Sequence, residues 1–161
     1  MRARITTLSV LLVASALAGC GGGGTSAAPP TTTTTIAIAP ADRPACALLF
    51  ARLKRVTLAI KTSSGLIAHS LNERQLSRRI AIEQVQLERS ATLMSGGPIP
   101  APLVAADRRL VAALRAFSRD FARARKPAGR GDFQAAAAAM TDPPVEQQIL
   151  RASKTIEDAC A

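Results

Sequence analysis

Residues 103–124 read LVAADRRLVAALRAFSRDFARA, and this stretch decides the fold. Its apolar side chains recur at intervals of 7, 4, 3, 4 and 3 residues, namely Leu103, Leu110, Leu114, Phe117, Phe121 and Ala124. That spacing places them on one side of a helix, in the pattern of a seam that packs inside a helical bundle. Pro127 and Gly129 follow, and both residue types favour the end of a helix. The stretch therefore predicts one long, amphipathic helix.

The residues before this helix show the same periodicity. Asp42 and Pro44 suit the start of a helix as cap and first-turn proline, and Ser63-Ser64-Gly65 would weaken that helix further along. A capping box at Ser70–Glu73 precedes a second apolar face. Gly96-Gly97-Pro98 ends this second helix. Two helices are thus expected ahead of residue 103.

Two more helices are expected after it. An alanine-rich segment runs from Asp132 to Met140, with Asp132 well placed as its cap. Asp142 and Pro143 then suit the start of a last helix, whose apolar side consists of Val145, Ile149, Ala152, Ile156 and Ala159. No stretch indicates a pair of strands. We therefore predict an all-α fold over residues 42–161, an antiparallel bundle of four main helices plus one short helix.

Two cysteines bracket this predicted domain. Cys46 lies in the first turn of the first helix, and Cys160 lies at the end of the last. In an up-and-down bundle of four helices these positions lie at the same end, so a disulfide between them is geometrically natural. A redox or metal-binding pair is the alternative, but the chain has no Cys-x-x-Cys and a single histidine, His69. We predict an N- to C-terminal structural disulfide.

The first 19 residues have the layout of a secretory signal peptide. Arg2 and Arg4 form a positive start, and an apolar run extends from Ile5 to Ala18. Polar residues interrupt this run, and it is shorter than the roughly 20 apolar residues that a transmembrane helix needs. Export would place the mature chain in an oxidising compartment, where disulfides persist.

The end of this segment, Leu17-Ala18-Gly19-Cys20, resembles the lipobox of bacterial lipoproteins. The resemblance implies that the Cys20 thiol receives a diacylglyceryl group, that cleavage falls before Cys20, and that the new amino group is acylated, for example with palmitate. Two or more acyl chains hold a protein stably on a membrane, whereas one chain binds only marginally. The alternative is an ordinary signal peptide whose cleavage site happens to hold a cysteine.

A low-complexity segment separates Cys20 from the predicted domain. It contains four glycines in a row and then mainly Thr, Ser, Ala and Pro, a composition that buries too little apolar surface to fold. We interpret residues 20–41 as the lipidated cysteine and a flexible tether. The order of signal, tether and helical domain resembles small helical lipoproteins of high-GC Gram-positive bacteria, a group that brings no common activity with it.

The charge of the chain is strongly positive, with 21 Lys+Arg against 11 Asp+Glu, and removal of residues 1–19 lowers the formal charge from +10 to +8. Part of this charge forms a stripe at spacings of 7, 4 and 7 on the long helix, hereafter the basic stripe: Arg108, Arg115, Arg119 and Lys126. Such a stripe could bind anionic lipid or a wall polymer, or it could be a solvated face. The chain has no Trp or Tyr, so recognition of nucleic acid through aromatic stacking is not expected.

We find no motif for catalysis, a metal or a cofactor. His69 has no glutamate three residues before it and no second histidine, and a surface position is expected. Asp107 falls on the apolar seam, and we interpret it as an acid that complements the helix dipole. Gly-Arg-Gly-Asp at 129–132 is too short a match to indicate adhesion.

These observations predict a lipoprotein anchored to the extracytoplasmic face of the cell membrane, with a helical domain that is a non-enzymatic interaction module. The alternative is a module that binds a lipid or a small apolar ligand in a pocket between its helices. A scattered catalytic site, which one sequence does not reveal, is a third hypothesis.

Overall fold

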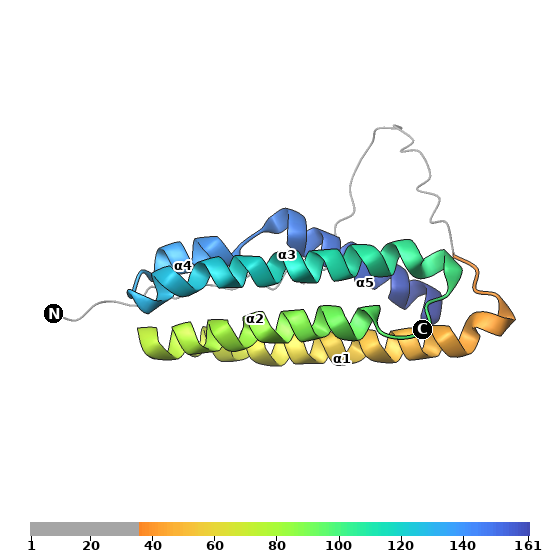
Figure 1. Ribbon diagram of the computed structural model, residues 1–161, viewed down its shortest axis with the longest axis horizontal. Helices are drawn as coiled ribbons and strands as arrows, with labels where there is room; N and C mark the ends of the chain where they lie inside the picture. The colour runs from red at the N-terminus through yellow and green to blue at the C-terminus, as the bar shows by residue number, and fades with distance from the viewer. Residues whose placement is uncertain (1–35) are drawn as a thin grey trace, which may run out of the picture. The chain divides into compact units, whose positions relative to one another are not determined.

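The computed structural model describes residues 36–161 (Figure 1). A 3-10 turn at Pro40–Asp42 leads into α1, and a second 3-10 turn at Ala101–Leu103 leads into α3. The helices are α1 (Arg43–Ala68), α2 (Glu73–Ser95), α3 (Val104–Gly129), α4 (Phe133–Met140) and α5 (Pro143–Cys160). The prediction of an all-α bundle with four main helices and one short helix is confirmed.

The helices form a ring around one core. In Figure 1 they lie lengthwise beside one another. α2 packs against α1 and α3, and α5 packs against α3 and α1, so that α1 and α3 are diagonal partners. α4 covers the part of α3 that α5 does not reach. α4 and α5 are joined by a short link and together form the fourth side of the bundle. Asp142 separates them by accepting a hydrogen bond from the Val145 amide, 3.2 Å away, while Pro143 opens α5.

The predicted seam of α3 lies in the core. Leu103, Leu110, Leu114, Phe121 and Ala124 are buried, and Phe117 is partly buried with its ring edge-on to that of Phe121, 5.0 Å between centroids. Small buried side chains let neighbouring helices approach closely, and they are Ala91, Ala106, Ala113, Ala124, Ala128, Ala136 and Ala152. The interior is therefore filled by leucine and isoleucine from every main helix, with alanine where the helices meet closely.

Three local features differ from the sequence pattern. α1 continues through Ser63-Ser64-Gly65, and the hydroxyl of Ser63 donates to the Ala59 carbonyl oxygen, 2.8 Å away, inside the helix. α2 is capped by Asn72 instead of Ser70, with the Asn72 side chain accepting from the Gln75 amide at 2.9 Å. Pro127 lies inside the last turn of α3, which runs on to Gly129. The cap of α2 and the end of α3 differ from the pattern by two residues each, and the topology is unaffected.

The start of the described chain already touches the bundle. Ile36 and Ile38 are partly buried and pack against the core. The contact therefore begins within the segment that the sequence composition assigns to the tether. Cys20, the signal peptide of residues 1–19 and the rest of the tether up to residue 35 lie outside the described residues.

A disulfide joins Cys46 to Cys160, as predicted, with the two Cα atoms 5.3 Å apart. It links the first turn of α1 to the last residue of α5. The two cysteines are 114 positions apart, and for a loop of this size the chain-entropy model gives almost 5 kcal/mol, as an upper figure. The bond therefore holds α1 beside α5 at one end of the bundle.

A buried arginine organises the turn between α2 and α3. The guanidinium of Arg52, on α1, donates to the carbonyl oxygens of Met94 (3.1 Å), Gly96 and Pro98 (2.9 Å). These carbonyls lie where α2 ends and have no helical partner of their own. Gly97 has φ +107°, and a Cβ there would come within 3.2 Å of Arg52 Nη1. The Gly-Gly-Pro sequence thus ends α2 and also makes room for this guanidinium.

Asp107 is the acidic partner of this arrangement. Its side chain is buried, so the interpretation of an ordinary first-turn acid is incomplete. Burial raises the pKa of the Asp107 carboxyl, and the nearby charge of Arg52 opposes that rise. The charge of Arg52 therefore offsets part of the cost of burying the Asp107 carboxylate.

We expect the change Arg52→Met to lower the free energy of unfolding by about 2–4 kcal/mol, since it orphans three carbonyls and leaves the Asp107 charge without its partner. Urea denaturation followed by circular dichroism measures this. Arg55→Met, on the exposed side of α1, is the matched control and should cost little. Adding Asp107→Asn to Arg52→Met should recover part of the loss. Equal stability of the Arg52→Met and Arg55→Met proteins would contradict the proposed role of Arg52.

Candidate functional site

A groove lies between α1 and α5 and is here called the α1–α5 groove. Its cavity volume is about 720 Å³, within the roughly 300–1,000 Å³ typical of ligand pockets. Leu110 and Leu114 of α3 lie at its base together with Leu53 and Val56 of α1, and all four are buried. The base of the groove is therefore part of the hydrophobic core itself.

The walls and edges of the groove are also mostly apolar. Phe50 and Ile60 from α1 and Ile149 from α5 are partly buried and form its walls. At its edges, Leu58 on α1 is 66% exposed and Leu150 on α5 is 68% exposed. Large apolar side chains this exposed on facing helices point to a surface that is used for binding.

Lysines mark the edges of this apolar surface. The chain has only four lysines against 17 arginines, and three of the four, Lys54, Lys61 and Lys154, line the groove. All three are exposed. A lysine can lay its aliphatic stem along an apolar wall and keep its ammonium in water. One acidic residue, Glu157, lines the groove with them.

The three ammonium groups have different surroundings. That of Lys54 lies 4.1 Å from the centroid of the Phe50 ring, at cation–π distance. That of Lys154 donates to Asp158 at 2.8 Å, and this hydrogen bond, with the charge of Asp158, raises the pKa of Lys154. Lys61 has no ion pair with any residue in the range 36–161. The positive charge that is free to meet a ligand is therefore greatest at Lys61.

The basic stripe is brought together as its spacing predicts. Its four residues lie on exposed positions of α3, on the side away from the buried seam, and they are Arg108, Arg115, Arg119 and Lys126. The two ion pairs among the described residues involve other basic side chains, Arg123 with Asp120 and Lys154 with Asp158. None of the four stripe residues therefore forms an ion pair with a residue between 36 and 161.

The remaining candidates from the sequence do not form a site. His69 is exposed, just after the last residue of α1. Between residues 36 and 161, no three His, Cys, Asp or Glu side chains are close enough to hold a metal ion. None of the helices in that same range combines the length and apolarity that crossing a membrane requires. Cys20, the predicted attachment point for lipid, lies outside the described part of the chain.

Buried carboxyls are a feature that the sequence pattern largely missed. Glu83 on α2 is completely buried, although it lies three residues after Ile80 and four before Leu87, which is the spacing of the apolar face. That spacing is the signal that could have found it. Burial raises the pKa of Glu83, and a hydrogen bond from the Ser64 hydroxyl opposes this.

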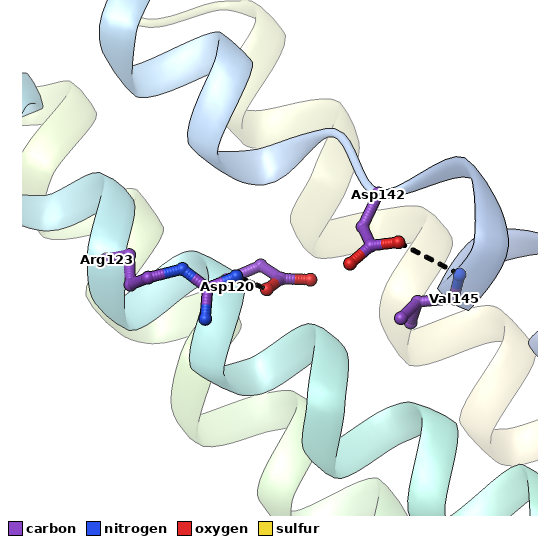
Figure 2. Close-up of polar contacts among 4 residues, drawn as sticks. All are labelled: Asp120, Arg123, Asp142 and Val145. Atoms are coloured by element: carbon purple, nitrogen blue, oxygen red, sulfur yellow. Dashed lines mark hydrogen bonds and ion pairs between the residues drawn. The ribbon is translucent and has the colours of Figure 1, made fainter.

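Asp120 on α3 is the buried carboxyl nearest to a second acid. Figure 2 shows its carboxylate between Arg123, with which it forms an ion pair, and Asp142 at the start of α5. Its second oxygen, Oδ2, is buried without a hydrogen-bond partner. Burial raises the pKa of Asp120, the charge of Arg123 lowers it, and the charge of Asp142 raises it again. This pair of acids lies where α3 meets the α4–α5 link and is separate from the groove.

No protein-family model, curated protein or solved structure matches this chain. The groove and the basic stripe are therefore interpreted from their own chemistry.

We expect Asp120→Asn to raise the free energy of unfolding at pH 7 by about 1 kcal/mol, because it removes a buried charge that faces Asp142. The pKa of Asp120 is higher in the folded than in the unfolded chain, so folding takes up protons. Its contribution to stability therefore falls as pH rises from the ordinary value of 3.8 through the folded value. The gain from Asp120→Asn should accordingly shrink toward pH 4.

Urea titrations at pH 4, 5.5 and 7 test this expectation. Asp158→Asn is the control, since the Asp158 side chain is 52% exposed and its charge is not buried. A gain from Asp120→Asn that is the same at every pH would show that repulsion and burial of its charge are not the cause.

Proposed function

We propose that the protein is a lipoprotein of the bacterial cell envelope, held by Cys20 on the extracytoplasmic face of the cell membrane, with the bundle acting as a non-enzymatic interaction module. The observation that carries the anchoring is the order of a positive start, an apolar run and Leu17-Ala18-Gly19-Cys20. A membrane tie of this kind keeps the bundle within reach of lipid head groups and wall polymers.

The disulfide supports an exported location. Such bonds persist in oxidising compartments and are rare in the bacterial cytosol. Cys46 and Cys160 pair with each other, which leaves Cys20 as the single cysteine of the chain available for a lipid. The three cysteines thus divide into one anchor and one internal bond.

The basic stripe supports the interaction role. Anionic lipids attract nearby lysine and arginine by about 1 kcal/mol per residue, and four such residues follow one exposed line along α3. A domain that is tied to a membrane already has a high local concentration of these head groups, so weak individual contacts suffice. The partner we propose for the stripe is anionic lipid or an anionic wall polymer.

A second candidate function rests on the α1–α5 groove. Its apolar base and exposed apolar edges are suited to a lipid or another apolar molecule between the helices. The two functions use different faces of the bundle, because the stripe lies on the outer side of α3 and the groove lies between α1 and α5. One protein can therefore carry both.

We expect Cys20→Ala to abolish lipid attachment and to release the protein from the membrane fraction. Metabolic labelling with an alkyne analogue of palmitate, followed by fractionation, measures both effects. The Cys46→Ala/Cys160→Ala protein is the matched control and should keep the label. Label that persists on the Cys20→Ala protein would rule out this attachment point.

We expect the change of Arg108, Arg115, Arg119 and Lys126 to Gln to weaken binding to anionic vesicles by roughly a thousandfold at low salt, from about 1 kcal/mol for each residue. The experiment uses the chain from Gly21 onward without lipid, so that only the protein surface binds. The matched control removes four exposed arginines from α1 and α2 instead, namely Arg55, Arg74, Arg78 and Arg89. Equal loss in the two variants would indicate a general effect of net charge and would remove the stripe as a site.

A further inference from the structure

We propose that the α1–α5 groove binds a long-chain fatty acid, with the acyl chain along the apolar base and the carboxylate at Lys61. The proposal rests on the second function given above and names its ligand. A single-chain anionic amphiphile matches the groove, because the groove combines one continuous apolar surface with positive charge at its edge.

The dimensions of the groove suit one extended chain. Along α1 it runs from Phe50 to Lys61, and 11 residues of helix correspond to about 16 Å. α5 lies alongside with its last turn joined to the first turn of α1 by the disulfide, so Glu157 is near the Phe50 end and Ile149 is nearer the Lys61 end. Apolar residues are present along the whole of this length.

The charges distinguish the two ends. Near the disulfide, Glu157 lines the groove, and Lys154 already has Asp158 as a partner. At the other end Lys61 is exposed, and no residue from 36 to 161 forms an ion pair with it. No acidic residue lines that end of the groove. A carboxylate is therefore favoured at Lys61 and disfavoured at Glu157, which gives the bound chain one direction.

The ammonium of Lys54 adds positive charge to the same wall of the groove, nearer to the Phe50 end than Lys61 is. It lies over the Phe50 ring instead of beside a carboxylate, so its charge is not neutralised by an acid within the described chain. Lys54 is seven residues from Lys61, two turns along the same side of α1. Two positive groups on one wall attract an anionic amphiphile more strongly than a neutral one of the same length.

The test uses the full lipidated chain in its own membranes. The probe is palmitate with a diazirine in the middle of its chain and a terminal alkyne, and the cross-linked peptides are identified by mass spectrometry. We expect adducts on residues 50–61 of α1 and 149–157 of α5. Unlabelled palmitate should compete, and hexadecanol, which has the same chain without the charge, should compete much less.

Two charge-reversal variants test where the carboxylate of the fatty acid binds. Lys61→Glu should lower the labelling roughly tenfold, since it replaces attraction by repulsion at an exposed residue that does not affect folding. Arg89→Glu reverses the charge of an exposed residue of α2 that belongs neither to the groove nor to the basic stripe, and its labelling should equal that of the unchanged protein. Ser153→Phe, which fills the groove from α5, should abolish the labelling while circular dichroism stays unchanged.

The possible results distinguish a failure of the fatty-acid proposal from a failure of the functions proposed above. Equal competition by palmitate and hexadecanol would overturn the fatty acid and leave a general apolar groove. Adducts outside the groove would overturn the groove as a lipid site. Equal labelling by a phospholipid with a diazirine in its acyl chain would show that the groove contacts the bilayer. Cross-linked dimers would show that a second copy of this protein covers the groove. Either result overturns the proposal. Failure of anchoring is read independently, from the membrane fraction of the same sample.

Discussion

The disulfide between Cys46 and Cys160 holds together the two helices that are farthest apart in the sequence, and the other features of the bundle depend on this. A bundle without it would need α1 and α5 to bury enough apolar surface to close the ring by themselves. With the ends joined, the interface between α1 and α5 can stay partly open. The α1–α5 groove is therefore compatible with a stable fold because a covalent bond replaces some of the packing.

The elements of the fold follow from local patterns. Residues close in sequence are enough to predict the apolar seam from Leu103 to Ala124 and the helix start at Asp142 and Pro143. The number of helices is enough to predict that the two cysteines lie at the same end of the bundle. Helix ends depend on finer choices: Asn72 and Ser70 are both good caps, and only the geometry of the turn decides between them. Pro127 is tolerated because it lies in a final turn.

The interior polar groups were not predictable in the same way. Arg52 looks like any of the chain's many arginines, and its role appears only when α1 is placed beside the end of α2. Asp120 is similar, since its burial depends on which side of α3 the neighbouring helices cover, whereas the spacing of Glu83 from Ile80 and Leu87 does mark it as part of the apolar face of α2. The basic stripe could be predicted from spacing on one helix. The groove could not, because it combines residues of α1, α3 and α5 that no sequence spacing relates.

Because the disulfide lies at one end of the bundle, the two ends should differ in how readily they open. At one end α1 and α5 are joined covalently, and Arg52 ties the α2–α3 turn to α1. At the other end the α1–α2 turn ends with Leu71, which is 86% exposed, and α5 has given way to the short α4. Local opening is favoured where fewer contacts must break, so amide hydrogen exchange should be graded from slow at the closed end to fast at the far one. Lys61 lies toward the end of the bundle that is far from the disulfide. The positively charged end of the groove is therefore where the helices separate most readily.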